Sequence, residues 1–457
     1  MEIAWKKYNQ KQKKEVFAFA ETYRKFLSDC KTERECVNEG IRIAEAHGFK
    51  NIEDCIKNRT KLQPGDKVYL NNKGKDLALF IIGRKPLSEG MNILGAHIDS
   101  PRIDWKQHPF YEDHDIALAD THYYGGIKAY QWVTLPLALH GVVCRKDGSS
   151  VNVVIGEKAS DPVVGISDLL IHLSREQLQK TASKVIEGED LNVTLGSIPL
   201  EKAEKEAVKA NILKLLKKKY DIEEDDFISA EIEVVPAGPA RHYGLDESMI
   251  MGYGHDDRVC VYTSLMALME IENPEKTVSC MLVDKEEVGS IGSTGMQSYF
   301  YENIVAELVD LVEGYDYLTF RRCLANSKML SSDVSAAYDP NYPSVNEMKN
   351  TAFFGYGIVI NKYVGSGGKS GSNDAHPEYI AEIRKVWDEA DISWQTAELG
   401  RVNRGGGGTI AYIMAKYNMQ VIDSGVAVQN MHAPWEVVSK ADVYEAKNAY
   451  VAFCKNI

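Results

Sequence analysis

Hydrophobic residues near the start of the chain recur at intervals of three and four positions, which is typical of an amphipathic helix. These residues are Val16, Phe17, Phe19, Ala20, Tyr23 and Phe26. The apolar run DLALFIIGR follows, and NILGAHIDSP repeats the theme with a strand expected over residues 92–96. Both runs are short enough to be buried strands. A helix followed by buried strands predicts an α/β layer.

The pattern changes between about Pro101 and Arg241. Aromatic segments that are rich in turn residues (HPFYEDHD, DTHYYGG) accompany alternating runs (WVTLPLALHGVVC, SVNVVIGE) that predict antiparallel strands. The charged stretch from Glu201 to Asp226 contains spaced apolar residues, which favour an exposed amphipathic helix over a binding tail. We interpret residues 101–241 as a second domain.

The α/β pattern returns after GHDDR. VCVYTSLMALMEI predicts a helix, VSCMLVD a buried strand and GSTGMQSYFYENIVAELVD another helix. FGYGIVINKY, ISWQTAEL and MQVIDSGV predict further strands, and a last helix is expected from Ser439, where S-K-A-D resembles a capping arrangement. Residues 1–100 and 242–457 are therefore expected to form one α/β domain that the second domain interrupts.

Composition and charge narrow the functional class. The chain has 457 residues with an ordinary globular composition, and its net charge of −13 disfavours nucleic acid or an anionic membrane as a partner. No apolar run is long enough to span a membrane, and the first residues lack the pattern of a signal peptide. The eight cysteines are scattered without CxxC pairs. We therefore expect a cytoplasmic protein with reduced thiols.

Candidate chemistry lies at the ends of predicted strands, beside small residues. In an extended segment His97 and Asp99 share one side, so Asp99 can accept the second imidazole N–H and orient His97 toward a metal. Asp256 in GHDDR can bridge two metals from a helix start, although an acid at that position is often only a cap.

The segment DKEEVGS follows a buried strand and carries two adjacent glutamates. On a tight loop they can point apart, with Glu287 on a metal and Glu286 facing a water as the general base. Asp333 in SSDVS and His432 in MHAP complete the inventory. Taken alone, each segment is better explained by a solvated turn, a helix cap or a structural histidine. Together, two histidines and three carboxylates suit two zinc ions that share an oxygen bridge.

The segments AHIDSPR, GHDDR, DKEEVGS, SSDVSAAYDPNY and NMHAPWE resemble the aspartyl aminopeptidase family of co-catalytic zinc exopeptidases, and the resemblance spans nearly the whole chain. It implies two Zn²⁺ per subunit, with Co²⁺ or Mn²⁺ as alternatives. The implied ligands are His97, Asp256, Glu287, Asp333 and His432, with Asp256 bridging. Glu286 is the implied base and Asp99 the implied support of His97.

The resemblance also implies an architecture. A mixed-sheet α/β/α catalytic domain (1–100 and 242–457) would be interrupted by a mainly β dimerisation domain (101–241). Dimers would assemble into a hollow tetrahedral homododecamer with its active sites facing inward. His172 in LLIHLSR lies where related enzymes carry a histidine that reaches the active site of a neighbour.

The chain departs from the family pattern at Asp339, where acid-selective members typically have histidine before Pro-Asn-Tyr. A carboxylate near the substrate would repel an N-terminal Asp or Glu, although Lys369 in GSGGKSGSN offers a compensating positive charge. Met431 is a candidate for the side-chain pocket, and a buried methionine is also a common core residue.

The expected reaction is release of the N-terminal residue from peptides with a free N-terminus, by a metal-activated water and Glu286. A carboxypeptidase or deacylase of the same broad fold is an alternative, because paired zinc ions do not choose which end of a substrate is read. A non-catalytic shell protein that keeps the fold is a third. The chain has no GxSxG elbow for a serine triad, and GRVNRGGGGTIAY lacks the lysine spacing of a P-loop.

Overall fold

The computed structural model describes residues 2–457, and the chain divides into two compact units. Unit 1 contains the residues up to Asp99, Ala240–Met431 and Glu436–Ile457. Unit 2 contains Ser100–Pro239 and His432–Trp435. Unit 2 therefore begins just after the His97–Asp99 segment and includes a short segment near the C-terminus, which no sequence pattern indicated.

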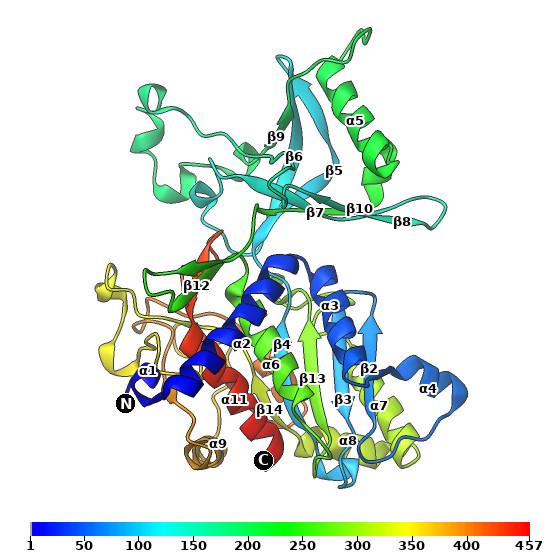
Figure 1. Cartoon of the computed structure of the whole chain (residues 1–457), viewed down its shortest axis with the longest axis vertical. Coiled ribbons are helices and arrows are strands. Elements are labelled where there is room, and N and C mark those ends of the chain that lie inside the picture. Colours follow the sequence, from blue (N-terminus) through cyan, green and yellow to red (C-terminus); the bar gives the residue numbers. More distant parts are fainter. Residues whose placement is uncertain (1) are drawn as a thin grey trace. The chain divides into compact units, whose positions relative to one another are not determined.

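Unit 1 is built on a nine-stranded mixed sheet (Figure 1). Its strand order is β1 (Lys50–Asn51), β2 (Lys67–Asn72), β3 (Asp76–Ile81), β13 (Val278–Val283), β4 (Asn92–His97), β14 (Lys328–Ser331), β18 (Gln420–Gly425), β16 (Ile358–Asn361), β17 (Trp394–Thr396). The four central strands β13, β4, β14 and β18 run parallel to one another. Their carboxyl ends therefore share one edge of the sheet, where α/β proteins assemble their sites.

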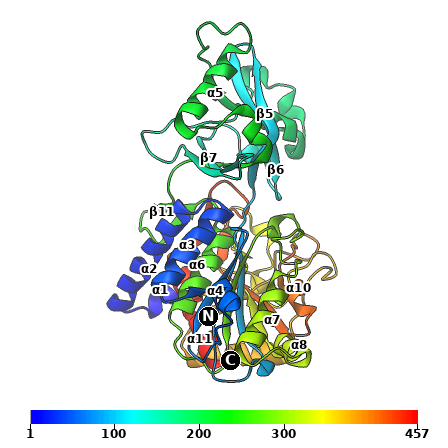
Figure 2. The same cartoon turned by 90° about the vertical axis from the view of Figure 1, so that its right-hand side faces the viewer.

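Helices cover both faces of this sheet (Figure 2). One face packs against α2 (Gln10–Asp29), α3 (Glu33–Ala46), α6 (His255–Met269), α9 (Pro377–Glu389) and α11 (Lys440–Asn456). The other packs against α4 (Ile52–Asn58), α7 (Phe300–Val312), α8 (Tyr317–Asn326) and α10 (Ala411–Ala415). Each face therefore has its own apolar core: the first core lies on the α6 side and the second core on the α7 side. Leu79 of β3 lies in the first core and its neighbour Phe80 in the second, because successive side chains of a strand point to opposite faces.

Local signals explain where several helices begin. Capping boxes open α2, through Asn9 and Gln12, and α3, through Thr32 and Glu35. Helix α11 follows Ser439 as predicted, but the Ser439 side chain makes no capping hydrogen bond, so the predicted capping arrangement is wrong. The short helix α1 (Ala4–Lys7) precedes α2. Helix α7 begins later than the sequence pattern indicated, because the glycine-containing segment before it forms a loop.

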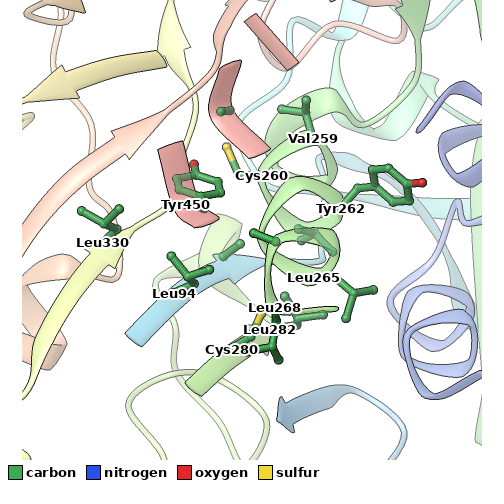
Figure 3. Close-up of a cluster of buried hydrophobic side chains, with 14 of the residues drawn as sticks. Leu94, Val259, Cys260, Tyr262, Leu265, Leu268, Cys280, Leu282, Leu330 and Tyr450 are labelled. Atoms are coloured by element: carbon green, nitrogen blue, oxygen red, sulfur yellow. The ribbon is translucent and has the colours of Figure 1, made fainter. Parts of the chain in front are cut away.

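Helix α6 lies at the centre of the first core and is buried on nearly every side (Figure 3). Val259 and Leu265 project from it, while Leu94 of β4 and Tyr450 of α11 belong to the same cluster. A helix that is apolar all round is typical of a protein interior. This packing fixes the position of the helix start, which carries Asp256.

A second sheet in unit 1 supports the segments around the predicted site residues. Its strand order is β11 (Arg241–Tyr243), β12 (Met249–Gly252), β20 (Glu436–Ser439), β19 (Ala427–Gln429), β15 (Ser335–Ala336). Strand β15 begins shortly after Asp333, and β12 leads into α6. These strands were not expected from the sequence, because each has only two to four residues and shows no clear alternation.

Unit 2 is an antiparallel sheet with the order β8 (Ser150–Ile155), β7 (Leu137–Cys144), β10 (Ala230–Pro236), β5 (Arg102–Asp113), β6 (Ile116–Tyr124), β9 (Val193–Gly196). The segments HPFYED and DTHYY lie within β5 and β6, so our prediction of turns there is wrong. The turn is confined to His114 and Asp115, both with positive φ. The charged stretch forms the helix α5 (Ala207–Tyr220), shorter than expected.

The eight cysteines are free thiols, as their spacing predicted. In the described range 2–457, none of the helices combines the length and the apolar character needed to cross a membrane.

Candidate active site

Three predicted site segments follow the carboxyl ends of central parallel strands. His97 is the last residue of β4. Glu286 and Glu287 open the short 3₁₀ turn that follows β13, and Asp333 lies just beyond β14. Asp256 comes from the start of α6, where its backbone departs from helical geometry. The sheet edge therefore brings together residues that are far apart in the sequence.

His97 is the centre of this cluster. Its Nε2 atom lies 3.2 Å from Oδ1 of Asp256, 3.9 Å from Oδ1 of Asp333 and 4.0 Å from Oε2 of Glu286. Its Nδ1 atom lies 3.0 Å from the main-chain carbonyl oxygen of Asp99 and 3.3 Å from the Asp99 carboxylate. With Nδ1–H donated to Asp99, Nε2 is the ring nitrogen that faces the carboxylates. A histidine that binds a metal through Nε2 has this arrangement.

Within unit 1, two overlapping groups of side chains have the composition of a metal site. His97, Asp256 and Asp333 form one, and His97, Glu286 and Glu287 form the other. In each group the ligand atoms lie within 4.8 Å of one another. Imidazole nitrogen and carboxylate oxygen are ligands that zinc binds readily. The residues present therefore fit a zinc centre.

Burial and the crowding of carboxyl groups shift the pKa values at this edge of the sheet. Burial raises the pKa of Asp333 well above its usual range, and the neighbouring carboxylates of Glu286 and Asp256 raise it further. Burial and the charge of Asp333 likewise raise the pKa of Asp257. Burial lowers the pKa of His97, but hydrogen bonds to Asp256 and Asp99 outweigh it and leave that pKa raised. A bound cation would relieve the repulsion among these carboxylates.

The Asp99 carboxylate also holds the loop that carries the two glutamates. Its Oδ1 atom accepts the backbone N–H of Glu286 and its Oδ2 atom accepts that of Glu287, each at 3.1 Å. Asp99 is fully buried. The sequence indicated only the contact between Asp99 and His97, so the structure adds a second task for this residue.

His432 belongs to unit 2. It has a left-handed backbone with φ of 65°, and its Nδ1 atom lies 2.8 Å from the carbonyl oxygen of Gly126. As in His97, an Nδ1–H that donates to a main-chain carbonyl leaves Nε2 as the ligand atom. His432 therefore has the tautomer that metal binding requires.

The structure reveals further residues that support the predicted ligands. The Asp257 carboxylate accepts the backbone N–H of His97 at 3.3 Å, and the Glu436 carboxylate accepts that of Asp256 at 3.0 Å. Asp257 and Glu436 lie within the motifs GHDDR and NMHAPWE, which gave a signal for their region but not for their partners. Gly126 had no such signal.

The four predicted substrate-binding residues lie in varied surroundings. Lys369 forms an ion pair with Asp374 at 3.1 Å and lies over the ring of Tyr363. The carboxylate of half-buried Asp339 accepts the backbone N–H of Asn341. Met431 is partly buried and packs against the first core. His172 is exposed on a 3₁₀ turn of unit 2.

Comparison with known proteins decides the family. A family model described as "Aminopeptidase I zinc metalloprotease (M18)" matches residues 26–454. The chain belongs to the M18 family. A probable M18 family aminopeptidase 1 of Clostridium acetobutylicum is 63% identical over 454 residues, which cover 99% of this chain and 98% of that protein. The expected family is therefore confirmed.

Solved structures agree with the M18 fold. The crystal structure of an M18 aminopeptidase from Thermotoga maritima has a TM-score of 0.95 at 43% identity, covering 100% of this chain and 99% of that chain. The structure of an S. cerevisiae mApe1 dodecamer has a TM-score of 0.76 at 20% identity, covering 95% of each chain, and this likeness concerns the fold alone. The predicted α/β fold class is confirmed.

Membership of the M18 family also confirms the predicted activity class. This chain is a zinc metallo-aminopeptidase, a hydrolase that acts on peptides. The carboxypeptidase, deacylase and shell-protein alternatives receive no support from these relatives.

Proposed function

We propose that this M18 enzyme binds two zinc ions through the predicted residues. His97 and Asp333 would hold one ion, Glu287 and His432 would hold the other, and Asp256 would contribute to both. The observation that carries the proposal is the orientation of His97, whose Nε2 faces Asp256 and Asp333 while Asp99 engages Nδ1. Co²⁺ or Mn²⁺ would fit the same donors.

Glu286 is the general base in this proposal. Zinc, when bound, supplies a water of lowered pKa and positive charge that stabilises the developing oxyanion. The Glu286 carboxylate accepts the proton of the attacking water and returns it to the leaving amine. Asp99 supports this exchange, because it fixes the backbone N–H of Glu286 and engages the ring of His97.

The substrate is a peptide with a free N-terminus. We propose that Met431, Asp339 and Lys369 contribute to selection of the N-terminal side chain. Since Lys369 already pairs with Asp374, its charge is partly neutralised, and the carboxylate of Asp339 disfavours acidic residues. We therefore expect neutral N-terminal residues to be cleaved faster than Asp or Glu.

Unit 2 is the proposed self-association domain, with dimers assembling into a tetrahedral homododecamer. Support comes from its exposed apolar side chains, which include Leu170, Ile171 and Leu173 at 54%, 69% and 66% exposure. Such a patch is typical of a protein interface. His172 lies among these residues, consistent with a role toward a neighbouring subunit. The free thiols agree with a cytoplasmic location.

A panel of free-amine aminoacyl substrates and their N-acylated counterparts tests the proposed function. Release of N-terminal residues should disappear with a chelator and return with zinc or cobalt. Measurement of bound zinc should give two ions per chain. Cleavage of only the N-acylated substrates would contradict the proposal.

The base is tested separately with Glu286→Gln. This variant should retain both zinc ions and lose roughly 10²–10⁴-fold in kcat, the usual contribution of a general base. Normal turnover with normal zinc would exclude Glu286 as the base.

A further inference from the structure

The loop after β13 curls back on itself. It leaves the sheet at Asp284, carries Glu286 and Glu287, and returns at Gly295, which forms an isolated parallel bridge with Asp284. Lys285 and Ser290 both have positive φ, at 66° and 58°. Such left-handed conformations in residues other than glycine are held only when the surroundings fix them.

Asp284 and Thr294 fasten the two ends of this loop. The Oδ2 atom of Asp284 accepts the hydroxyl of Thr294 at 2.7 Å and the ammonium of Lys285 at 2.9 Å. The Oδ1 atom accepts the backbone N–H of Lys285 at 2.8 Å. Asp284 and Thr294 are only 1% and 5% exposed. Hydrogen bonds to a buried charged acceptor are among the stronger ones in proteins.

The interior of the loop leaves little space for another path. The backbone N–H of Ser290 donates to the carbonyl of Lys285 at 2.7 Å. A Cβ atom added to Gly295 would lie 2.3 Å from the carbonyl oxygen of Ser290, so the return strand requires glycine there. The loop is therefore compact, and the Asp284–Thr294 hydrogen bond closes it.

The two glutamates depend on this loop to different degrees. The Asp99 carboxylate fixes both of their backbone N–H groups. In the proposed function a metal also holds the side chain of Glu287, whereas the base Glu286 has no such ligand bond. The loop places the backbone of Glu286, from which the carboxylate extends until its Oε2 atom lies 4.0 Å from Nε2 of His97.

We propose that Asp284 and Thr294 are positioning residues for Glu286. Their hydrogen bond closes the loop and holds the carboxylate of the base in its productive direction. This inference rests on the proposed function, because it takes Glu286 as the base. Small misplacements of a catalytic group can cost about 100-fold in rate.

The test compares Thr294→Val, which removes the hydroxyl donor at nearly constant volume, with Thr294→Ser, which keeps it. The matched control is Thr121→Val in unit 2. Thr121 is 2% exposed and donates a 2.7 Å hydrogen bond to the carbonyl of Leu191. Each variant is measured for kcat, KM, bound zinc and thermal midpoint, beside Glu286→Gln.

The expected result is a 10- to 100-fold fall in kcat for Thr294→Val, with KM and zinc content close to those of the unmodified enzyme. Thr294→Ser should restore most of kcat. Thr121→Val should lower the thermal midpoint comparably without a change in kcat.

Several outcomes would overturn the inference. Thr294→Val could keep normal kcat while Glu286→Gln is inactive, or its kcat could fall only in proportion to lost zinc. Failure of Thr294→Ser to restore kcat would also overturn it. Normal turnover in Glu286→Gln would instead overturn the proposed function itself, so the two failures are read from different variants.

Discussion

The surroundings of His97 and His432 differ, although in both imidazoles Nδ1 forms a hydrogen bond with a main-chain carbonyl oxygen. His97 ends a buried strand and finds its carbonyl acceptor two residues away, at Asp99. His432 lies in a half-buried, left-handed segment, and its acceptor Gly126 is 306 positions earlier in the chain. One proposed ligand is therefore oriented by local sequence and a rigid strand, and the other by a contact that only the folded unit 2 provides.

We expect the largest effects on bound zinc and turnover when each histidine is replaced in turn. His97→Ala should abolish the first zinc site and disturb the second, because His97 belongs to both clusters of candidate ligand atoms. His432→Ala should leave one zinc ion per chain. In both variants turnover should fall by more than the roughly 10- to 100-fold that loss of an outer partner causes.

Elemental analysis of zinc per chain distinguishes the two variants. Retention of two ions in His97→Ala would contradict the assignment of His97 as a ligand. Loss of both ions in His432→Ala would show that the strand-built site does not stand alone.

A smaller effect is expected for Asp99→Asn. The amide keeps the shape of Asp99 but offers only one acceptor oxygen, so one of the backbone N–H groups of Glu286 and Glu287 loses its partner. We expect about a 10- to 100-fold loss in zinc affinity or kcat, as for other outer partners of metal ligands. Competition with a chromophoric chelator measures the affinity.

The matched control for Asp99→Asn is Asp246→Asn. The carboxylate of Asp246 accepts the N–H and hydroxyl of Ser248 on an exposed turn. This variant should bind zinc normally. An equal loss in both variants would mean that the effect is one of net charge and not of position.

Two glycine substitutions test how much change the surroundings of Asp333 and of His432 tolerate. A Cβ atom at Gly425 of β18 would lie 2.0 Å from the carbonyl oxygen of Asp333, whereas one at Gly126 would lie 3.5 Å from Nδ1 of His432. Gly425→Ala should therefore destabilise unit 1 by about 1–3 kcal/mol and reduce zinc binding. Gly126→Ala should change kcat by less than about threefold, since its new contact is an ordinary one.

Chemical denaturation and zinc analysis of the two glycine variants check this expectation. The reverse order of effects would show that the unit 2 segment, and not the strand edge, is the less tolerant support.

The smallest effect on turnover is expected for Asp442, which lies away from the site and influences the pH dependence of stability. Burial raises the pKa of Asp442 in α11 to about 8, although its carboxylate accepts the N–H groups of Gly355 and Gly357. Between pH 4 and 8 the folded chain binds this proton more tightly than the unfolded chain. The free energy of unfolding should therefore fall as pH rises, by at most about 1.4 kcal/mol per unit.

Urea denaturation of Asp442→Asn across this range provides the measurement. The variant should lose the part of the pH dependence that Asp442 causes, while kcat stays close to normal. An unchanged slope would mean that Asp442 is ionised in the folded enzyme.

The site residues that local sequence places could be predicted, whereas those that distant contacts place could not. The positions of His97, Glu286 and Asp333 could be anticipated because apolar runs mark the strands that precede them. The hydrogen-bond acceptors Asp257 and Gly126 could not be anticipated, since each meets its histidine from a distant segment of the chain. The five-stranded sheet was missed because its strands have only two to four residues, and β5 and β6 were missed because their polar and aromatic residues resemble turns.

Some local signals also misled in instructive ways. Ser439 has the sequence of a helix cap, but it is already the last residue of β20, and its side chain leaves the first turn of α11 uncapped. A strand that runs directly into a helix fixes the backbone without a side-chain cap. Local patterns therefore located elements better than they described how those elements end.

The order of the clustered residues along the chain determines when each is synthesised during translation. His97 and Asp99 leave the ribosome before all of Ser100–Pro239, while Asp333 emerges much later. A nascent chain that has not yet extended beyond Asp333 lacks one of the clustered carboxylates. The cluster of side chains around His97 is therefore complete only after most of the polypeptide has been translated.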